Sequence, residues 1–365
     1  MKIILIALEF PPLNTAGSVR PFRMAVELMR NGLDVTVLTM SKNERHGLFS
    51  KPNNLNLDSS MLKVIEIDPS HPDRAKRNKI HAWFSTGDYY MDVWGSDVIE
   101  WLQHEIECNG RPDWIMGTCP PFSTAMLLLK IKAQFGFPYI LDLRDAWSQW
   151  NVNPLTSYFH YLAKVRDERR CISSAAITLT TSEQTRQDLV KLHGQEMNIC
   201  CVENGYDVHI QFPERLQWKS PDSDPITIGY VGSFYFDPSA HERMRSKWYQ
   251  RLPHRWFHYT PRKEDWTYRS PYYFFQVLQA VFHLEPSWRK NITIEFVGRT
   301  PDWLTQMIES FEFEDIVKSH GQVSLSRSLE IQKSFDFFLG TSAKIEGQPD
   351  YSMGSKYFEA LQFLK

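Results

Sequence analysis

Short apolar runs alternate with helix-like segments along most of the chain, and this alternation constrains the fold more than any other feature. The runs IILIAL, DVTVLTM and PYILDL read as strands, and apolar residues at helical spacing follow several such runs. Near-continuous apolar strands that alternate with helices indicate parallel sheets covered by helices on both faces. The sequence therefore predicts an α/β protein with Rossmann-like, parallel-sheet domains.

A polar stretch, QFPERLQWKSPDSDP at 211–225, interrupts the alternation, which resumes with ITIGYVGS. Its Pro, Ser and Asp content is typical of a linker, and 365 residues exceed one ordinary core. We expect an N-terminal domain at 1–210, a linker at 211–225, and a second domain at 226–365 with an insertion at about 237–270. Ligands bind outside the carboxyl ends of the strands in such sheets, so two domains facing each other would form a cleft.

Composition excludes several classes of protein. A formal net charge of −2 gives no global attraction to nucleic acid, and no apolar run approaches the ~18 residues of a membrane span. The five cysteines show no CxxC spacing, which indicates buried, reduced thiols in a cytoplasmic protein. The acidic DSD at 222–224 lies in the expected linker and reads as a solvated turn. We expect neither a metal ion nor a cofactor.

The stretch EFPPLNTAGSVRPFRMAVELMRNG joins the first apolar run to an amphipathic helix through a loop of small residues. Gly17 allows close approach to a helix N-terminus, where free N–H groups and the helix dipole favour an anion. Arg20, one turn later, would add a charged donor. The alternative is that Gly17 only permits a tight turn between strand and helix.

Three charged residues, Asp142, Arg144 and Asp145, end the apolar strand of PYILDLRDAW. Charges at such a position are costly to bury unless they are paired or used. We expect them to face the cleft, the alternative being an internal ion pair.

The stretch YSMGSKYFEAL near the C-terminus repeats the pattern of a small-residue loop before a helix. Gly354 and Ser355 would open the helix, and Lys356 in its first turn is unfavourable for the dipole unless an anion lies beside it. Glu359 lies one turn further and could accept hydrogen bonds from the vicinal hydroxyls of a ribose. The alternative is an ordinary surface helix with a solvated Lys and Glu.

Two further strands end in small or cationic residues. YVGSF supplies Gly232 and Ser233, and FVGR supplies Gly298 and Arg299. Each could face the cleft, and each could equally be a simple turn.

Together these stretches resemble the retaining GT-B glycosyltransferases usually called family 4. The resemblance rests on EFPPLNTAGSVRPFRMAVELMRNGLDVTVLT, PYILDLRDAW, TTSEQTRQDL followed by ENGYD, IGYVGSF, FVGR and GSKYFEAL, in family order along nearly the whole chain. It implies two Rossmann-like domains facing a cleft, the GT-B fold. It also implies that the N-terminal domain holds a glycan or lipid-linked acceptor and the C-terminal domain a nucleotide-diphosphate sugar.

The activity implied is metal-independent hexosyl transfer, in which backbone donors and cations stabilise the leaving diphosphate. The cell-envelope polysaccharides of bacteria are the expected products. The candidate residues fall into three groups: Lys356, Arg299 and Asp145 for catalysis; Gly232, Ser233, Gly298, Gly354, Ser355 and Glu359 for the donor; Gly17, Arg20, Thr118 and Arg144 for the acceptor side of the cleft.

The sequence also departs from the family pattern. Tyr351 occupies the position of the first of two family carboxylates, with Asp350 one residue early, and Thr118–Cys119 stands where a histidine is frequent. The sequence stops inside the last recognisable motif, so we expect a truncated C-terminal domain. These departures keep two alternatives open: a catalytically inactive protein that binds a nucleotide or a partner, and a GT-B nucleotide-sugar epimerase.

The insertion explains much of the aromatic content, because Trp248, Trp256 and Trp266 are interleaved with arginines and lysines. Aromatic residues with cations suit a peripheral contact of 243–272 with the inner face of a membrane or with a lipid diphosphate. The alternative is a solvated excursion whose aromatic side chains pack on the second domain. Binding of nucleic acid is not expected.

Overall fold

The computed structural model describes residues 1–11, 13, 16–41, 60–70, 89–149, 154–205, 222, 224–342, 344–346 and 360. The chain forms two compact units. Unit 1 comprises Met1–Glu203 and Leu252–Pro261, and unit 2 comprises Asn204–Arg251 and Arg262–Lys365. Most of the linker expected at 211–225 lies outside the described residues.

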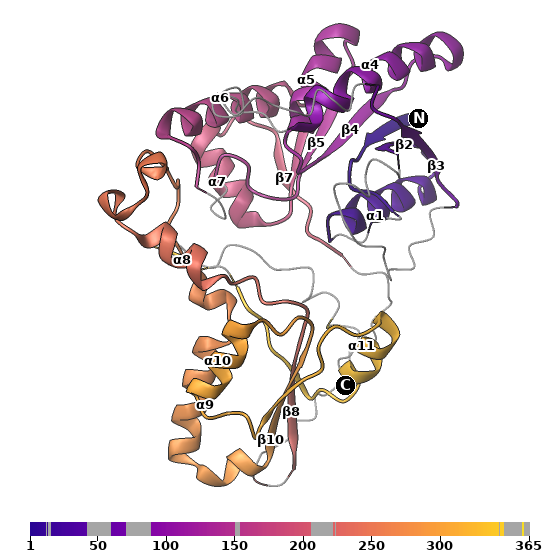
Figure 1. Ribbon diagram of the computed structural model, residues 1–365. Helices are drawn as coiled ribbons and strands as arrows, with labels where there is room; N and C mark the ends of the chain where they lie inside the picture. The colour runs from indigo at the N-terminus through magenta and orange to yellow at the C-terminus, as the bar shows by residue number, and fades with distance from the viewer. Residues whose placement is uncertain are drawn as a thin grey trace. The chain divides into compact units, whose positions relative to one another are not determined.

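Unit 1 is built on a seven-stranded parallel sheet with the strand order β3-β2-β1-β4-β5-β6-β7 (Figure 1). This is the doubly wound order, in which the chain reverses its direction of travel between β1 and β4. The elements are β1 (Lys2–Ile6), α1 (Ala16–Arg30), β2 (Asp34–Met40), β3 (Lys63–Ile67), α4 (Tyr89–Asn109), β4 (Trp114–Cys119), α5 (Ser123–Phe135), β5 (Tyr139–Leu143), α6 (Tyr158–Ser174), β6 (Ile177–Thr180), α7 (Glu183–His193) and β7 (Ile199–Cys201).

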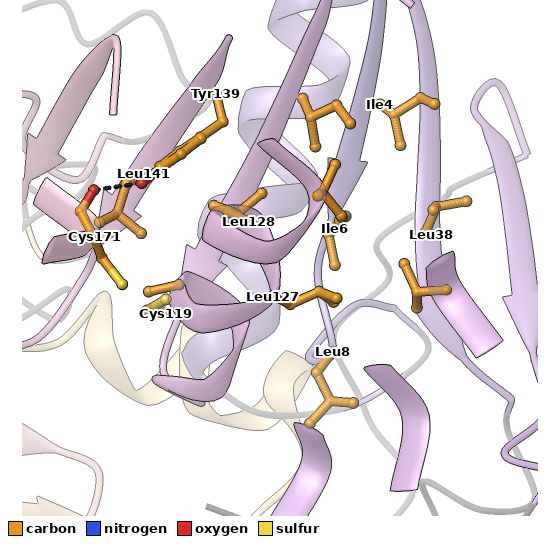
Figure 2. Packing of buried hydrophobic residues seen from close by; sticks show 14 of the residues in the cluster. Ile4, Ile6, Leu8, Leu38, Cys119, Leu127, Leu128, Tyr139, Leu141 and Cys171 are labelled. Carbon is orange, nitrogen blue, oxygen red and sulfur yellow. Dashed lines mark hydrogen bonds between the residues drawn. The ribbon is translucent and has the colours of Figure 1, made fainter. Parts of the chain in front are cut away.

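Apolar clusters cover both faces of this sheet. On one face, Leu127 and Leu128 of α5 pack with strand residues such as Ile6 and Leu141, all of them almost fully buried (Figure 2). The hydroxyl of Tyr139 donates to the carbonyl of Cys171 at 2.5 Å and links β5 to α6. The strands are apolar without alternation because helices remove both faces from water.

The other face of the sheet is covered by α1. Ala25 is fully buried there, and Phe22, Val26 and Met29 pack against the same cluster, as their helical spacing predicts. The helix ends at Arg30, and Gly32, with a φ of +80°, donates its N–H to the carbonyl of Met29. It begins at Ala16, so Gly17 lies inside its first turn.

Unit 2 is built on a four-stranded parallel sheet with the order β11-β10-β8-β12. In chain order this is again the arrangement 3-2-1-4, with a reversal between β8 and β12. The parallel strands and the helices are β8 (Ile226–Val231), α8 (Pro238–Arg245), α9 (Tyr272–Leu284), β10 (Ile292–Val297), α10 (Asp302–Ser310), β11 (Val317–Ser319), α11 (Leu325–Gln332) and β12 (Phe337–Phe338).

The basic and aromatic insertion is divided between the units. In unit 2, β9 (Glu264–Asp265) pairs antiparallel with β13 (Lys344–Ile345), and Trp266 is buried. Residues 252–261 group with unit 1, where Leu155 and Tyr259 exchange backbone hydrogen bonds of 2.8 and 2.9 Å. The insertion also holds the 3₁₀ turns η2 (Trp248–Gln250), η3 (Pro253–Arg255) and η4 (Trp266–Arg269), and η5 (Pro286–Lys290) precedes β10.

The cysteines and the helices bear on two expectations from composition, that the thiols are buried and that no segment spans a membrane. All five cysteines are free thiols, but Cys108 is exposed, so the prediction that the thiols are buried is wrong for this residue. It is the penultimate residue of α4. None of the helices in the described part of the chain has the length and apolar content that a membrane span requires.

Candidate functional site

Each sheet has one reversal of strand order, and the loops at the carboxyl ends of the strands on either side diverge there. Such a divergence leaves a crevice and is the usual ligand position in open α/β sheets. In unit 1 the reversal lies between β1 and β4, so the residues that follow these strands and the neighbouring β5 form the first candidate region.

Gly17 makes room for an ion pair. A Cβ atom on Gly17 would lie 2.2 Å from Oε2 of Glu9 and 2.3 Å from Nη1 of Arg144. Nη2 of Arg144 lies 3.3 Å from Oε1 of Glu9 and also donates to the carbonyl of Pro120 at 2.6 Å. The Glu9 carboxylate of the chain itself lies beside Gly17 in the first turn of α1, and the role of Gly17 toward a ligand stays a prediction.

Arg20 does not line a surface, because it is buried and bound to Asp142. Nη2 of Arg20 donates to Oδ1 of Asp142 at 2.8 Å, and Nε lies 3.1 Å from both carboxylate oxygens. Thr118 of β4 donates to Oδ2 of the same carboxylate at 3.0 Å, and Nη1 of Arg20 donates to the carbonyl of Glu203. For Asp142 and Arg20 the internal ion pair is thus the observed alternative.

Asp145 differs from its neighbours because it is exposed. Partial desolvation of its carboxyl group raises its pKa above the ordinary value. The guanidinium of Arg144 opposes this rise, and the carboxylates of Glu9 and Asp142 add to it. A carboxylate with a raised pKa at the carboxyl end of β5 is a suitable acceptor for a hydroxyl proton.

A small hollow lies at the same edge of unit 1. Its lining is mainly apolar, and the hydroxyl-bearing residues of the lining come from the first turn of α5. The lining residues are Leu8, Trp94, Gly95, Pro121, Ser123, Thr124 and Leu127.

In unit 2 the reversal lies between β8 and β12. Gly232 and Ser233 follow β8, and Gly298 and Arg299 follow the adjacent β10, so the two motifs named from the sequence share one sheet edge. Gly340 follows β12 and is exposed on the other side of the reversal. The second candidate region is this edge.

The two glycines of this edge are packed against each other. Gly298 has a φ of +153°, and a Cβ there would lie 2.2 Å from the carbonyl oxygen of Gly232. The N–H of Gly232 donates to the carbonyl of Val297 at 2.6 Å, and the N–H of Gly298 donates to the carbonyl of Gly321 at 2.9 Å. Both N–H groups are therefore bonded within unit 2, and the exposed Arg299 directly follows this close contact of two backbones.

Among the described residues, no group of three or more His, Cys, Asp and Glu side chains is arranged to hold a metal ion.

Known structures share this architecture. The crystal structure of Anabaena Alr3699/HepE in complex with UDP and glucose matches with a TM-score of 0.52 at 13% identity, over 99% of this chain and 78% of that chain. The lipopolysaccharide outer core galactosyltransferase WaaB, in its apo form, gives 0.53 at 13% identity over 100% and 78%. TarM gives 0.53 at 9% identity over 95% and 81%. No protein-family model matches the sequence, and no curated protein matches it.

The chain has the GT-B fold.

The C-terminal motif expected to complete a GT-B donor site lies outside the described residues. This applies to the predicted donor and catalytic residues Gly354, Ser355, Lys356 and Glu359, and to Tyr351 at the position of the missing carboxylate. Their roles remain predictions.

Two residues of the GT-B edges were not singled out from the sequence. Glu9 directly follows the first apolar run. A single carboxylate at this position, beside the small-residue loop, could have indicated a partner for a nearby cation. Gly340 ends the run FDFFLG. Its place at the second candidate region follows only from the strand order, in which β12 lies beside β8.

Proposed function

We propose that this chain is a glycosyltransferase that moves a sugar from a nucleotide-diphosphate donor to a glycan or lipid-linked acceptor in envelope polysaccharide synthesis. The observation that carries the proposal is the exposed Arg299, which follows the close contact of Gly232 and Gly298 at the carboxyl ends of β8 and β10, next to the strand reversal of unit 2. Two structural neighbours support it: one was solved with UDP and glucose, and another is a lipopolysaccharide galactosyltransferase.

On the donor side, cations and the N–H groups of the predicted helix start at Gly354 and Ser355 would act on the diphosphate. Negative charge accumulates on this leaving group as the glycosidic bond breaks, so fixed donors stabilise the transition state more than the bound substrate. Arg299 supplies a cation from the described residues, and we propose Lys356 as the second. We further propose, from the sequence resemblance, that transfer retains the anomeric configuration and needs no metal ion.

On the acceptor side, we assign Asp145 the contact with the acceptor hydroxyl. Its exposure and raised pKa suit a group that receives a proton or a hydrogen bond from the substrate. Arg20 and Arg144 would serve this site as positioning residues, because both are held in ion pairs inside unit 1.

The test begins with binding. Melting of the full chain is followed with UDP, GDP and ADP, and a ligand that binds the folded state raises the melting temperature. Arg299→Ala should abolish most of this shift, whereas Arg327→Ala, which changes another exposed arginine of unit 2, should not. The proposed donor site is wrong if no nucleoside diphosphate stabilises the protein or if both variants behave alike.

Turnover is then measured as release of nucleoside diphosphate with a panel of nucleotide sugars. Lys356→Ala should lower it by about 10²-fold, the scale of losing one transition-state contact. Asp145→Asn should lower acceptor-dependent turnover while leaving the nucleotide-induced thermal shift unchanged.

A nucleotide-binding protein without transferase activity is the second candidate, because Tyr351 stands where the resemblance expects a carboxylate. It predicts a thermal shift with a nucleoside diphosphate and no release of that product from any sugar donor. Formation of an isomerised donor would instead indicate an epimerase.

A further inference from the structure

The last two turns of α4 carry an imidazole and a thiol side by side. His104 and Cys108 are four residues apart, so they lie on the same face of the helix. Sγ of Cys108 lies 3.6 Å from Nε2 and 3.8 Å from Nδ1 of His104, and both residues are exposed. Within the described part of the chain neither side chain has another hydrogen-bond partner, so both are available to a ligand.

The separation of these two side chains matches the span of one zinc ion. Zinc binds a thiolate at about 2.3 Å and an imidazole nitrogen at about 2.0–2.1 Å in tetrahedral geometry, which places the two ligand atoms about 3.6 Å apart. The distance from Sγ of Cys108 to Nε2 of His104 is 3.6 Å. Two ligands four residues apart on one helix face are also the arrangement by which paired histidines hold zinc. The pair is therefore spaced as a two-ligand chelate.

The electrostatic surroundings of the pair favour a cation. The helix α4 has 21 residues and contains Asp and Glu but neither Lys nor Arg. Its C-terminal end carries the negative pole of the helix dipole, and its last turn has no basic residue to compensate this charge. Two lysines from the strands, Lys2 and Lys63, both lie at the carboxylate of Glu105. A cation held by His104 and Cys108 would complement the end of the helix.

We propose that His104 and Cys108 form a binding site for one Zn²⁺ ion. The sulfur of Cys108 and one imidazole nitrogen of His104 are the protein ligands, and water fills the remaining positions of the ion. Binding forms one Zn–S and one Zn–N bond, and the thiol proton passes to solvent, so no oxidant or reductant takes part. With only two protein ligands, the ion should exchange with solution instead of being permanently held.

This site is separate from the candidate regions described above. Glu105, next to His104 in sequence, places Oε1 2.8 Å from Nζ of Lys2, the first residue of β1. The end of α4 thus lies at the amino ends of the strands, whereas the candidate region of unit 1 lies at their carboxyl ends. The inference therefore does not rest on the proposed glycosyl transfer and supplies no metal to it.

The experiment uses the full chain, reduced and stripped of metal, and titrates it with Zn²⁺ against a chromogenic chelator. We expect the wild type to compete for the ion. His104→Ala and Cys108→Ser should each weaken binding by about tenfold or more, because one remaining ligand forms no chelate. Since the sulfur ligand is the thiolate, binding by the wild type should tighten as the pH rises.

A second measurement identifies the ligands with Co²⁺ as the probe. A bound thiolate gives Co²⁺ a charge-transfer absorption band, which we expect in the wild type and not in Cys108→Ser. The matched controls are His283→Ala, at an exposed histidine of α9, and Cys201→Ser, at a partly exposed thiol. Both should bind Zn²⁺ and Co²⁺ as the wild type does. Melting temperatures without metal verify that all variants fold.

The proposal is overturned if the wild type binds Zn²⁺ no more tightly than the His104 and Cys108 variants, or if the charge-transfer band persists in Cys108→Ser. It is also overturned if Cys108→Ser loses the ion while His104→Ala retains it at the affinity of the wild type. That result would leave a single thiol as the ligand and remove His104 from the site.

Discussion

Arg20 of α1 and Asp142 of β5 form a buried, forked ion pair across 122 positions of sequence, with Nη2 2.8 Å from Oδ1. The carboxylate is fully buried and also accepts from Thr118. This pair ties the helix that follows β1 to the strand that carries Arg144 and Asp145 at its end. The ion pair therefore holds α1 and β5 together at the candidate edge of unit 1.

Removing one partner of this pair should be far more costly than removing both. Arg20→Met leaves an unpaired buried carboxylate, and we expect a loss of about 3–5 kcal/mol in the free energy of unfolding. The double variant Arg20→Met, Asp142→Asn should recover a large part, because an amide can still accept from Thr118. Urea denaturation measures both, and a loss below about 1 kcal/mol for the single variant would contradict the buried-pair interpretation.

Gly17→Ala should disturb the site while changing stability little. The new methyl group would meet the ends of the Glu9 and Arg144 side chains, which can swing away, and alanine favours a helix by up to about 1 kcal/mol. We expect a change of less than about 1 kcal/mol in unfolding free energy and a fall in acceptor-dependent turnover. Glu9→Gln, which removes the ion pair by another route, should reproduce the fall. A large loss of unfolding free energy for Gly17→Ala would show that the new methyl group meets atoms that cannot move aside, such as the backbone, rather than the ends of the two side chains.

Gly298→Ala should be much more damaging, because its methyl group would meet backbone. The carbonyl oxygen of Gly232 would lie 2.2 Å from the new Cβ, and the φ of +153° is unfavourable for alanine. We expect a loss of about 2 kcal/mol or more in unfolding free energy together with the loss of nucleoside diphosphate binding.

The matched control is Gly110→Ala, where φ is +78° and no atom lies within 4 Å of the added Cβ. It isolates the conformational cost, about 1 kcal/mol, and should leave nucleotide binding intact. Equal effects of the two substitutions would argue against a close approach at Gly298.

The pKa of Glu183 should be low in the folded protein. Hydrogen bonds from Arg186, and secondarily from Gln187, lower it from 4.5 to about 2. Because the folded state prefers the ionised carboxylate, this contribution to stability is present above pH 4.5 and is lost as the pH falls to about 2. An NMR titration of the Glu183 carboxyl carbon measures the pKa, and Arg186→Gln should return it toward 4.5. An unchanged pKa in that variant would exclude Arg186 as the cause.

The buried carboxylate of Glu168 should be essential to unit 1. It accepts from the N–H of Ser148 at 3.1 Å and from the hydroxyl of Ser148, and Nε2 of His193 lies 2.8 Å away. Glu168→Gln replaces one acceptor oxygen with a donor, and we expect a loss of about 2–3 kcal/mol in unfolding free energy. Ser148→Ala keeps the backbone contact and should cost less. A larger fall in melting temperature for Ser148→Ala than for Glu168→Gln would contradict this assignment.

The fold could be predicted because it follows from periodicity. Strand-like apolar runs and helical spacing predict the α/β class, and the runs IILIAL, DVTVLTM and PYILDL, interpreted as strands, contain β1, β2 and β5. Apolar runs and helical spacing can be recognised within a short stretch of sequence. They arise because both faces of a parallel sheet are buried by helices.

The partners of the charged residues could not be predicted. Asp142, Arg144 and Asp145 are close in sequence, yet one is buried with Arg20, one is paired with Glu9 and one is exposed. The alternation of side chains along β5 separates their environments, and partners distant in sequence decide which charge remains available. The cluster of charges in the sequence therefore indicates which edge of the sheet carries the candidate site, but it does not indicate which of the three charged residues is exposed there.

Residues 252–261 carry a consequence for dissecting this protein. They complete unit 1 although the chain on both sides of them belongs to unit 2, so neither unit is a continuous stretch of sequence. A fragment cut after Glu203 would lack Tyr259, which exchanges backbone hydrogen bonds with Leu155 and packs its ring beside those of Tyr158 and Tyr161. Recombinant pieces designed from a single boundary would thus be incomplete, and a faithful version of unit 1 would need this ten-residue passage grafted back.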